Sequence, residues 1–341
     1  LADGFAVAPR FLNSLGPEMI RALSAFPASA SQFLPRDGMP PLVGDTLRQP
    51  DLAETLRRIR DEGRDGFYLG TTADLIVAEM ERGAGLITHA DLAGYEPAWR
   101  QPIEFTYRGH AVISMPPSSS GGATLAELAN ILDTYDLPAA GWHSPEAIHL
   151  FAEAAKRAYA DRNHYLADPD FVDMPIGRMV STAYATERAS TITPSAATPS
   201  TDVTPGLGEV GEESENTTHF SIVDASGNAV SLTTTINSWY GSKVTVPGAG
   251  FVLNNEMDDF SAKPGTPNQY GLVQGEANGV EPGKRMLSAM TPTIVLDPAG
   301  SLRMVTGTPG GSTIITTVFQ TISDRESTRL NSSHVRTSRM P

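Results

Sequence analysis

The sequence predicts an α+β layered sandwich, chiefly because the apolar periodicity changes part-way along the chain. Before residue 190 the apolar residues recur mostly at helical spacing. After residue 216 they stand in short runs that end at turn-forming residues, as in β-strands. Helices followed by strands favour a layered α+β fold over a doubly wound parallel sheet.

Composition limits the class of protein. The chain has 341 residues, 40% of them hydrophobic, which suffices for one large domain or two smaller ones. Its 25 basic and 39 acidic residues give a net charge of −14, which argues against nucleic acid or anionic lipid as the main partner. The absence of cysteine excludes disulfides, thiolate metal ligands and a cysteine nucleophile. No apolar run approaches the roughly 18–20 residues of a membrane span.

Four amphipathic helices are predicted in the first part of the chain. Leucine and isoleucine at i, i+3, i+6 and i+7 mark the clearest helix, over residues 122–137. Ser144 followed by Pro145 is a typical helix start, so another helix is expected from there to about residue 161. The remaining predictions are helices over residues 51–64 and 72–82, and an extended ribbon over residues 103–107 and 111–114.

Residues 190–216 are expected to form a flexible, acidic linker. The segment is rich in Ser, Thr, Pro and Gly, ends in a cluster of Glu residues and has almost no apolar side chain to bury. Such segments are mobile and open to proteases. The linker therefore separates a mainly helical portion, residues 1–189, from a β-rich portion, residues 217–323.

The β-rich portion is expected to hold two strand pairs. Residues 218–223 and 229–235 flank a turn with the sequence Asp-Ala-Ser-Gly-Asn. Residues 293–296 and 302–306 flank a second turn, Asp-Pro-Ala-Gly. A glycine-rich turn over residues 307–312 then leads into an apolar helix that is expected to stop at about residue 323.

The two ends of the sequence look unlike those of a complete protein. The chain opens at Leu1 inside an ordinary folded segment, so a targeting signal cannot be assessed. Residues 324–341 are polar and basic, with no period of 2 or 3.6, and we expect them to be a non-native tail. We therefore treat the chain as a fragment that lacks both ends.

Common catalytic and metal-binding motifs are absent from the sequence. There is no H-E-x-x-H, G-x-S-x-G, Walker A or G-x-G-x-x-G pattern. The seven histidines never stand at ligand spacing, and the carboxylates over residues 168–173 lack the glycine and distal glutamate of a calcium loop. No metal site is predicted.

Thr217 stands where the linker meets the first strand, and two interpretations of it are open. If the chain is cut after Asn216, the new α-amino group becomes a base within reach of the Thr217 hydroxyl. An α-amino pKa of about 7.7–8 suits proton abstraction at neutral pH. Thr217 can also make the cut itself, by attacking the Asn216 carbonyl to form an ester that water hydrolyses. Alternatively, Thr217 and Thr218 are ordinary β-branched residues at the start of a strand.

From about residue 1 to residue 323, the sequence resembles the gamma-glutamyltransferase family of N-terminal-nucleophile (Ntn) hydrolases. The resemblance is densest in T-T-H-F-S-I-V-D, L-N-N-E-M-D-D-F-S-A-K-P-G and G-T-P-G-G-S. The matching motifs occupy residues 115–122, 165–172, 217–224, 227–230, 253–265, 284–288 and 307–312. The resemblance implies a four-layer αββα sandwich, incomplete in this chain.

The resemblance also implies roles for single residues. Thr217 would both cleave the bond after Asn216 and serve as the nucleophile, with the Thr235 hydroxyl hydrogen-bonded to it. The backbone amides of Gly310 and Gly311 would form the oxyanion hole. The residues implied to hold a γ-glutamyl substrate are Asn237, Glu256 and Asp259 at its α-amino group, Ser288 at its α-carboxylate, and Tyr270 in a lid over residues 264–275.

The function implied is transfer of a γ-glutamyl group from glutathione or a related amide to water, an amino acid or a peptide. No cofactor is expected, because backbone amides supply the charge stabilisation. The implied partners are these small molecules and the enzyme's own two subunits after cleavage, with no nucleic acid and no membrane span. The implied location is periplasmic or secreted.

One departure from the family pattern keeps other functions open. The family often has two adjacent serines where this chain has Ser288 and Ala289, so one hydroxyl for the α-carboxylate is missing. A cephalosporin or glutaryl acylase of the same fold is therefore an alternative, as is a non-catalytic, unprocessed protein. Because the outer parts of the family pattern are absent, including an arginine for the α-carboxylate, we expect the chain alone to be poorly folded and inactive.

Overall fold

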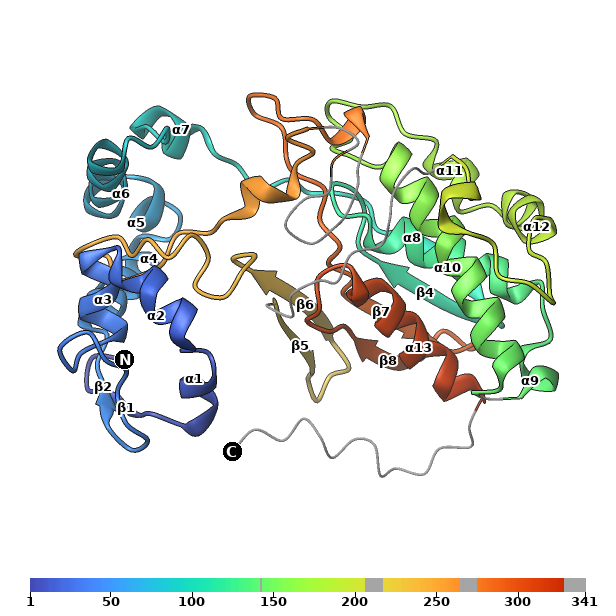
Figure 1. Cartoon of the computed structure of the whole chain (residues 1–341), viewed down its shortest axis with the longest axis horizontal. Helices are drawn as coiled ribbons and strands as arrows, with labels where there is room; N and C mark the ends of the chain where they lie inside the picture. Colours follow the sequence, from blue (N-terminus) through green and yellow to red (C-terminus); the bar gives the residue numbers. More distant parts are fainter. Residues whose placement is uncertain (142, 206–216, 264–265, 267–274, 328–341) are drawn as a thin grey trace. The chain divides into compact units, whose positions relative to one another are not determined.

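The computed structural model describes residues 1–141, 143–205, 217–263, 266 and 275–327, and it divides into two compact units (Figure 1). The first unit combines Leu1–Trp99 with Ile236–Asn255, and the second combines Arg100–Thr235 with the rest of the chain. These compact units are a different division from the predicted portions 1–189 and 217–323 on either side of the linker, which stay a prediction. Residues 236–255, which follow the hairpin over residues 217–235, belong instead with the N-terminal helices.

The first unit is built from short helices around two small apolar cores. Its elements are β1 (Phe5–Ala6), α1 (Pro9–Asn13), α2 (Pro17–Ser24), α3 (Pro27–Phe33), β2 (Thr46–Leu47), α4 (Pro50–Glu62), α5 (Asp65–Tyr68), α6 (Gly70–Gly83) and α7 (His89–Gly94). Proline at the first position of α1 to α4 suits a helix start, because the missing amide proton would be unpaired there. Thr55 donates to the carbonyl of Ala249 at 2.8 Å and so joins α4 to the 236–255 segment.

The second unit contains a four-stranded antiparallel sheet covered by helices. The strands β3 (Ile103–Tyr107), β4 (His110–Ser114), β7 (Thr293–Leu296) and β8 (Leu302–Thr306) lie in that order across the sheet. The helices are α8 (Gly121–Asp133), α9 (Leu137–Ala140), α10 (Pro145–Tyr165), α11 (Ile176–Met179), α12 (Thr182–Ser190) and α13 (Thr313–Ser327). Val112 and Val295 are opposed in the sheet and pack into one core with α8, α10 and α13.

A second sheet, the hairpin of β5 (Thr217–Val223) and β6 (Ala229–Thr235), contacts β7 and β8 (Figure 1). The helices, the four-stranded sheet and this hairpin form layers of the α+β class that the sequence predicts. The four predicted helices correspond to α4, α6, α8 and α10, and the three predicted strand pairs are all present. The last helix continues to Ser327, beyond its expected end. None of the helices described is both long and apolar enough to cross a membrane.

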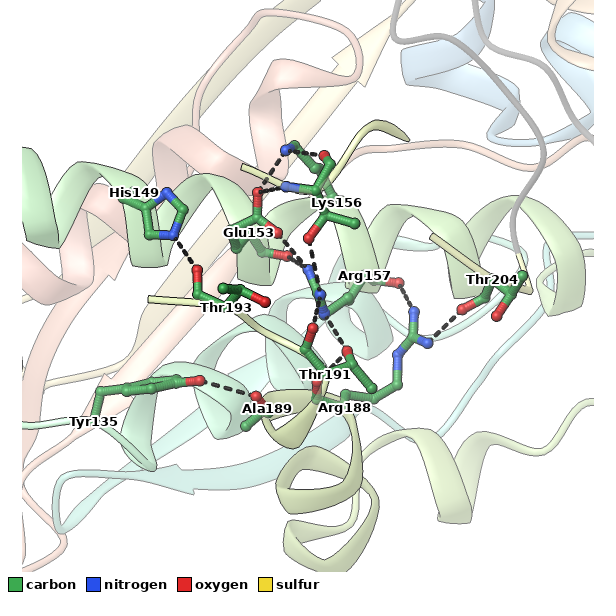
Figure 2. Close-up of polar contacts among 11 residues, drawn as sticks. Tyr135, His149, Glu153, Lys156, Arg157, Arg188, Ala189, Thr191, Thr193 and Thr204 are labelled. Atoms are coloured by element: carbon green, nitrogen blue, oxygen red, sulfur yellow. Dashed lines mark hydrogen bonds and ion pairs between the residues drawn. The ribbon is translucent and has the colours of Figure 1, made fainter. Parts of the chain in front are cut away.

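Polar contacts attach the first half of the predicted linker to α10 (Figure 2). The Arg157 guanidinium donates to the Thr191 hydroxyl and carbonyl, each at 2.6 Å. Glu153 accepts from Arg157 at 2.8 Å, from Lys156 at 2.6 Å and from the Thr198 amide at 3.0 Å. Composition did not predict this attachment, because it depends on charges that are buried within α10. Residues 206–216 lie outside the described part of the chain.

Candidate active site

Thr217 is the first residue of β5, and the hairpin register places it opposite Thr235, the last residue of β6. Directly opposed residues of an antiparallel pair project to the same face, with their Cβ atoms about 4.5–5.5 Å apart. Thr217 and Thr235 are partly buried, whereas Thr218 and Thr234 are exposed on the other face. The two inward hydroxyls can therefore reach each other.

The turn between the strands sets this register. The Asp224 carboxylate accepts from the Ser226 amide at 2.8 Å and the Asn228 amide at 2.9 Å. Its second oxygen accepts from the Asn228 side chain at 2.7 Å, and Gly227 takes a positive φ of 85°. A slip of one residue would turn Thr217 to the exposed face, so the turn controls where the candidate nucleophile points.

Two further inward residues hold the hairpin, Ser231 by hydrogen bonds to the neighbouring sheet and His219 by hydrogen bonds within the hairpin. The Ser231 hydroxyl donates to the Thr306 carbonyl at 2.9 Å and accepts from the Thr293 amide at 3.0 Å, so it contacts both β7 and β8. The His219 ring is hydrogen-bonded to the Thr233 hydroxyl at 2.8 Å and to the Ser221 hydroxyl at 3.0 Å. Burial lowers the pKa of His219, which favours the neutral ring.

The glycine-rich turn between β8 and α13 carries the proposed oxyanion donors. Gly310 has a φ of 135° and Gly311 a φ of 52°, conformations that suit glycine and few other residues. Thr313 fixes the turn by donating to the Gly310 carbonyl from its amide at 3.0 Å and from its hydroxyl at 2.6 Å. Within the described residues, no group accepts a hydrogen bond from the amides of Gly310 and Gly311. Both amides are thus suited to stabilise a developing oxyanion.

A pair of carboxylates lies on the short helix η2 (Glu256–Asp259). Burial, together with the charge of Asp259 and a hydrogen bond to it, raises the pKa of Glu256 to about 8. Two close carboxylates that share a partly buried site favour a proton or an external cation between them. An ammonium group of a ligand would satisfy both.

Ser288 lies in a loop that serine residues near α8 hold in place. The Ser288 amide donates to the Ser118 carbonyl at 3.0 Å, and its carbonyl accepts from the Ser120 amide at 2.8 Å and the Ser120 hydroxyl at 2.7 Å. Arg162, which is buried, donates to the Ser120 hydroxyl at 2.9 Å. The serines before α8 therefore fix the backbone of the Ser288 loop.

Three of the predicted site residues cannot be placed beside these groups. Asn216 and Tyr270 lie outside the described residues. Asn237 belongs to the first compact unit, where its side chain donates to the Asn255 carbonyl at 3.1 Å. No cluster of three or more His, Asp or Glu suited to a metal ion occurs in the described parts of the chain.

The family model described as gamma-glutamyltranspeptidase matches residues 1–333. The chain belongs to this family. The family resemblance that the motifs carried is thereby confirmed, while the roles of single residues stay predictions.

Curated relatives include proteins named glutathione hydrolase proenzyme. The protein from Pseudomonas sp. strain A14 is 48% identical over 86% of this chain and 51% of its own length. The Escherichia coli K12 protein is 47% identical over 94% of this chain and 55% of its own length. A protein named Acylase ACY 1 proenzyme, from Pseudomonas sp. strain SE83, is 38% identical over 94% of this chain and 54% of its own length. The chain thus spans about half the length of the curated relatives it matches.

Solved structures of the same fold confirm the predicted Ntn-hydrolase class. The cephalosporin acylase from Bacillus halodurans matches 96% of this chain and 57% of its own, with a TM-score of 0.80 and 26% identity. The gamma-glutamyltranspeptidase from Helicobacter pylori matches 62% of this chain and 61% of its own, with a TM-score of 0.58 and 38% identity.

Sequence reasoning missed two buried polar residues that hold the backbone near the predicted site residues Asp259 and Ser288. Asp168, considered above as part of a poor match to a calcium loop, is fully buried and accepts from the Arg285 amide at 2.7 Å. Asn278 is buried as well. Its side chain donates to the Asp259 carbonyl and accepts from the Leu287 amide. Asn278 lies in no predicted motif, whereas Asp168 lies in the motif over residues 165–172, a signal that could have singled it out.

Proposed function

We propose that the protein carrying this chain is a gamma-glutamyltransferase and glutathione hydrolase, made as a proenzyme that cleaves itself between Asn216 and Thr217. The observation that carries the proposal is the position of Thr217. It begins β5, faces inward and stands opposite Thr235. A threonine freed at this point has its own α-amino group as a base and a second hydroxyl beside it.

The catalytic cycle has two acyl-transfer steps. In the first, the α-amino group of Thr217 takes the proton of the hydroxyl while the oxygen attacks the γ-glutamyl carbonyl, and the amides of Gly310 and Gly311 stabilise the oxyanion. The C–N bond then breaks, the leaving amine receives that proton, and an ester on Thr217 remains. In the second, water or the amine of an amino acid or peptide attacks the ester and releases Thr217.

Substrate recognition is assigned to the charged ends of the γ-glutamyl group. The carboxylates of Glu256 and Asp259 bind the α-ammonium, and the Ser288 hydroxyl binds the α-carboxylate. Asn237 is assigned to the α-ammonium from the family resemblance alone. The family resemblance assigns Tyr270, which lies outside the described residues, to a lid that limits access of water. The relatives named glutathione hydrolase support glutathione as a donor. A periplasmic or secreted location is proposed from the family resemblance alone.

The two subunits would stay together after cleavage because the sheet contains strands from both. β4, which precedes the cleavage point, pairs with β7, which follows it, from Ala111↔Leu296 to Ser114↔Thr293. Both sides of the cut also contribute to one apolar core, with α8 and α10 on one side and α13 on the other. Cutting one bond leaves these contacts intact.

The test is intact-mass measurement and N-terminal sequencing of the full-length gene product that carries this chain, beside Thr217→Ala and the outward-facing control Thr218→Ala. We expect a new N-terminus at Thr217 in the wild type and in Thr218→Ala, and none in Thr217→Ala. A folded wild type that stays uncut would overturn the proposal and favour a non-catalytic protein.

A second candidate function is amide hydrolysis by an acylase of the same family. Ala289 removes a hydroxyl from the proposed carboxylate site, and the relative named Acylase ACY 1 matches nearly the whole chain. Comparing γ-glutamyl with glutaryl anilides separates the two functions, because the acyl groups differ only at the α-amino position. Faster cleavage of the glutaryl compound would favour the acylase.

A further inference from the structure

Asn278 joins two segments of the proposed substrate site through a single buried side chain. It ends the short helix η3 (Glu276–Asn278) and is 1% exposed. Its Nδ2 donates to the Asp259 carbonyl at 2.7 Å, and its Oδ1 accepts from the Leu287 amide at 3.0 Å. Its backbone carbonyl also accepts from the Ser261 amide at 2.9 Å.

These contacts require a primary amide of this length. One end of the planar group must donate and the other must accept, which neither a carboxylate nor an aliphatic side chain can do. Asp259 and Leu287 lie 28 residues apart in sequence, yet the amide holds the backbone of both. Because Ser288 directly follows Leu287, the same side chain relates the Asp259 carboxylate to the Ser288 hydroxyl.

Hydrogen bonds that do not involve Asn278 also hold the backbone around Ser288. The Ser288 backbone is fixed by Ser118 and Ser120, and the Arg285 amide by Asp168. The Asp259 side is held by the Asn278 amide and, through Ser261, by the Asn278 carbonyl. Loss of the amide would therefore displace Asp259 relative to a Ser288 that stays in place.

We infer that Asn278 is a positioning residue that sets the spacing between the Asp259 carboxylate and the Ser288 hydroxyl, and thereby selects acyl donors that carry an α-ammonium beside an α-carboxylate. The inference rests on the proposed function, because Asp259 and Ser288 bind the two charges of the donor only in that scheme. Asn278 itself contacts neither the donor nor Thr217. Its effect on catalysis is confined to recognition.

The experiment measures kcat and KM of the full-length gene product for a γ-glutamyl anilide and for the matching glutaryl anilide, which lacks only the α-amino group. Asn278→Asp keeps the size of the side chain but removes the donor, and Asn278→Ser is a smaller replacement that cannot span both partners. Asn130→Asp is the matched control, since Asn130 is also buried and donates to the Val180 carbonyl at 2.8 Å on another part of the same unit.

For both Asn278 variants we expect kcat/KM for the γ-glutamyl anilide to fall about 10- to 100-fold, mainly through KM, while kcat/KM for the glutaryl anilide changes less than about 3-fold. Cleavage at Thr217 should proceed in both variants, which establishes that they fold. Asn130→Asp should leave the ratio of the two substrates unchanged.

Two results would overturn the inference. An equal fall for both anilides in either Asn278 variant would show a general structural role, and unchanged kinetics would show that the spacing does not depend on Asn278. A wild type that is uncut or inactive on the γ-glutamyl anilide would instead overturn the proposed function, and the inference with it. Activity of the wild type thus distinguishes failure of the inference on Asn278 from failure of the proposed function.

Discussion

The imidazole ring of His219 fills the space in which a side chain at Gly307 would stand. A Cβ placed on Gly307 would collide with three atoms of the ring. His219 lies two residues after Thr217 on β5, and Gly307 lies three residues before Gly310. The strand that carries the candidate nucleophile therefore packs directly on the turn that carries the candidate oxyanion donors.

Gly307→Ala should destabilise the second unit, because the new methyl group displaces a hydrogen-bonded ring. We expect a loss of about 1–3 kcal/mol in the free energy of unfolding, measured by urea denaturation. Gly177→Ala is the control, since Gly177 is exposed and a Cβ there meets nothing within 4 Å. In a His219→Ala background the cost of Gly307→Ala should largely vanish. Additive effects of the two substitutions would contradict the steric explanation.

Thr235→Val should slow γ-glutamyl hydrolysis by about 10- to 100-fold, because it removes the hydroxyl opposite Thr217 and keeps the shape of the side chain. The measurement is kcat for a γ-glutamyl anilide, together with the rate of proenzyme cleavage. Thr234→Val makes the same chemical change on the exposed face of β6 and should have no effect. Equal losses in the two variants would mean that the hairpin, and not the hydroxyl, is responsible.

Much of the fold could be predicted from periodicity. The least predictable parts are the segments whose position depends on contacts with residues distant in sequence. The leucines of α8 recur at helical spacing, so the helix itself follows from its sequence, but the burial of every residue from 121 to 132 exceeds the single apolar face that this spacing predicts. The 236–255 segment has no such pattern, and its packing with the N-terminal helices depends on contacts such as Thr55 with Ala249. The predictions of Thr217 and Gly310 came from motifs. Asn278 lay in no motif, and the motif over residues 165–172 did not reveal the burial of Asp168 or its contact with the Arg285 amide, which is 117 residues away.

The raised pKa of Glu256 should make donor binding depend on pH. At pH 7 the Glu256 carboxyl is mostly protonated, since its pKa is about 8, and an ammonium group can pair fully with the site only after that proton leaves. We expect kcat/KM for a γ-glutamyl anilide to rise as pH increases through about 8. The Thr217 α-amino group must also lose its proton at about pH 7.7–8, so a glutaryl anilide should show a rise from that group alone, smaller than the rise for the γ-glutamyl anilide. Glu256→Gln should reduce the rise for the γ-glutamyl anilide to that of the glutaryl anilide, and an unchanged difference between the two substrates in that variant would assign it to another group.

The raised pKa of Glu256 also makes the free energy of unfolding depend on pH, in a direction that follows from the shift. Because the folded-state pKa of Glu256 lies above the ordinary value of 4.5, the folded protein binds more protons than the unfolded chain between about pH 4.5 and 8. Stability from this group is present below that window and is lost as pH rises through it. The unfolding midpoint of Glu256→Gln should therefore depend less on pH across the window than that of the wild type.

Glu153→Gln should loosen the segment between α12 and the cleavage point. Burial alone would raise the pKa of Glu153, but hydrogen bonds from Lys156, Thr198 and Arg157 lower it to about 2, so the carboxylate is charged at neutral pH. The uncharged amide keeps the size of the side chain and weakens the contact with Arg157 (Figure 2) and the contact with the Thr198 amide.

Limited proteolysis at pH 7 measures this loosening. We expect cleavage within residues 191–204 to become several-fold faster, because a hydrogen bond to a charged group contributes about 1.5–3 kcal/mol and local opening controls access of the protease. Glu187→Gln is the matched control, since Glu187 pairs with Arg178 in an exposed ion pair at 3.4 Å. In the wild type the protection should persist as pH falls to about 4 and disappear as it approaches 2. Unchanged proteolysis in Glu153→Gln would show that the remaining donors to this segment hold it without the buried carboxylate.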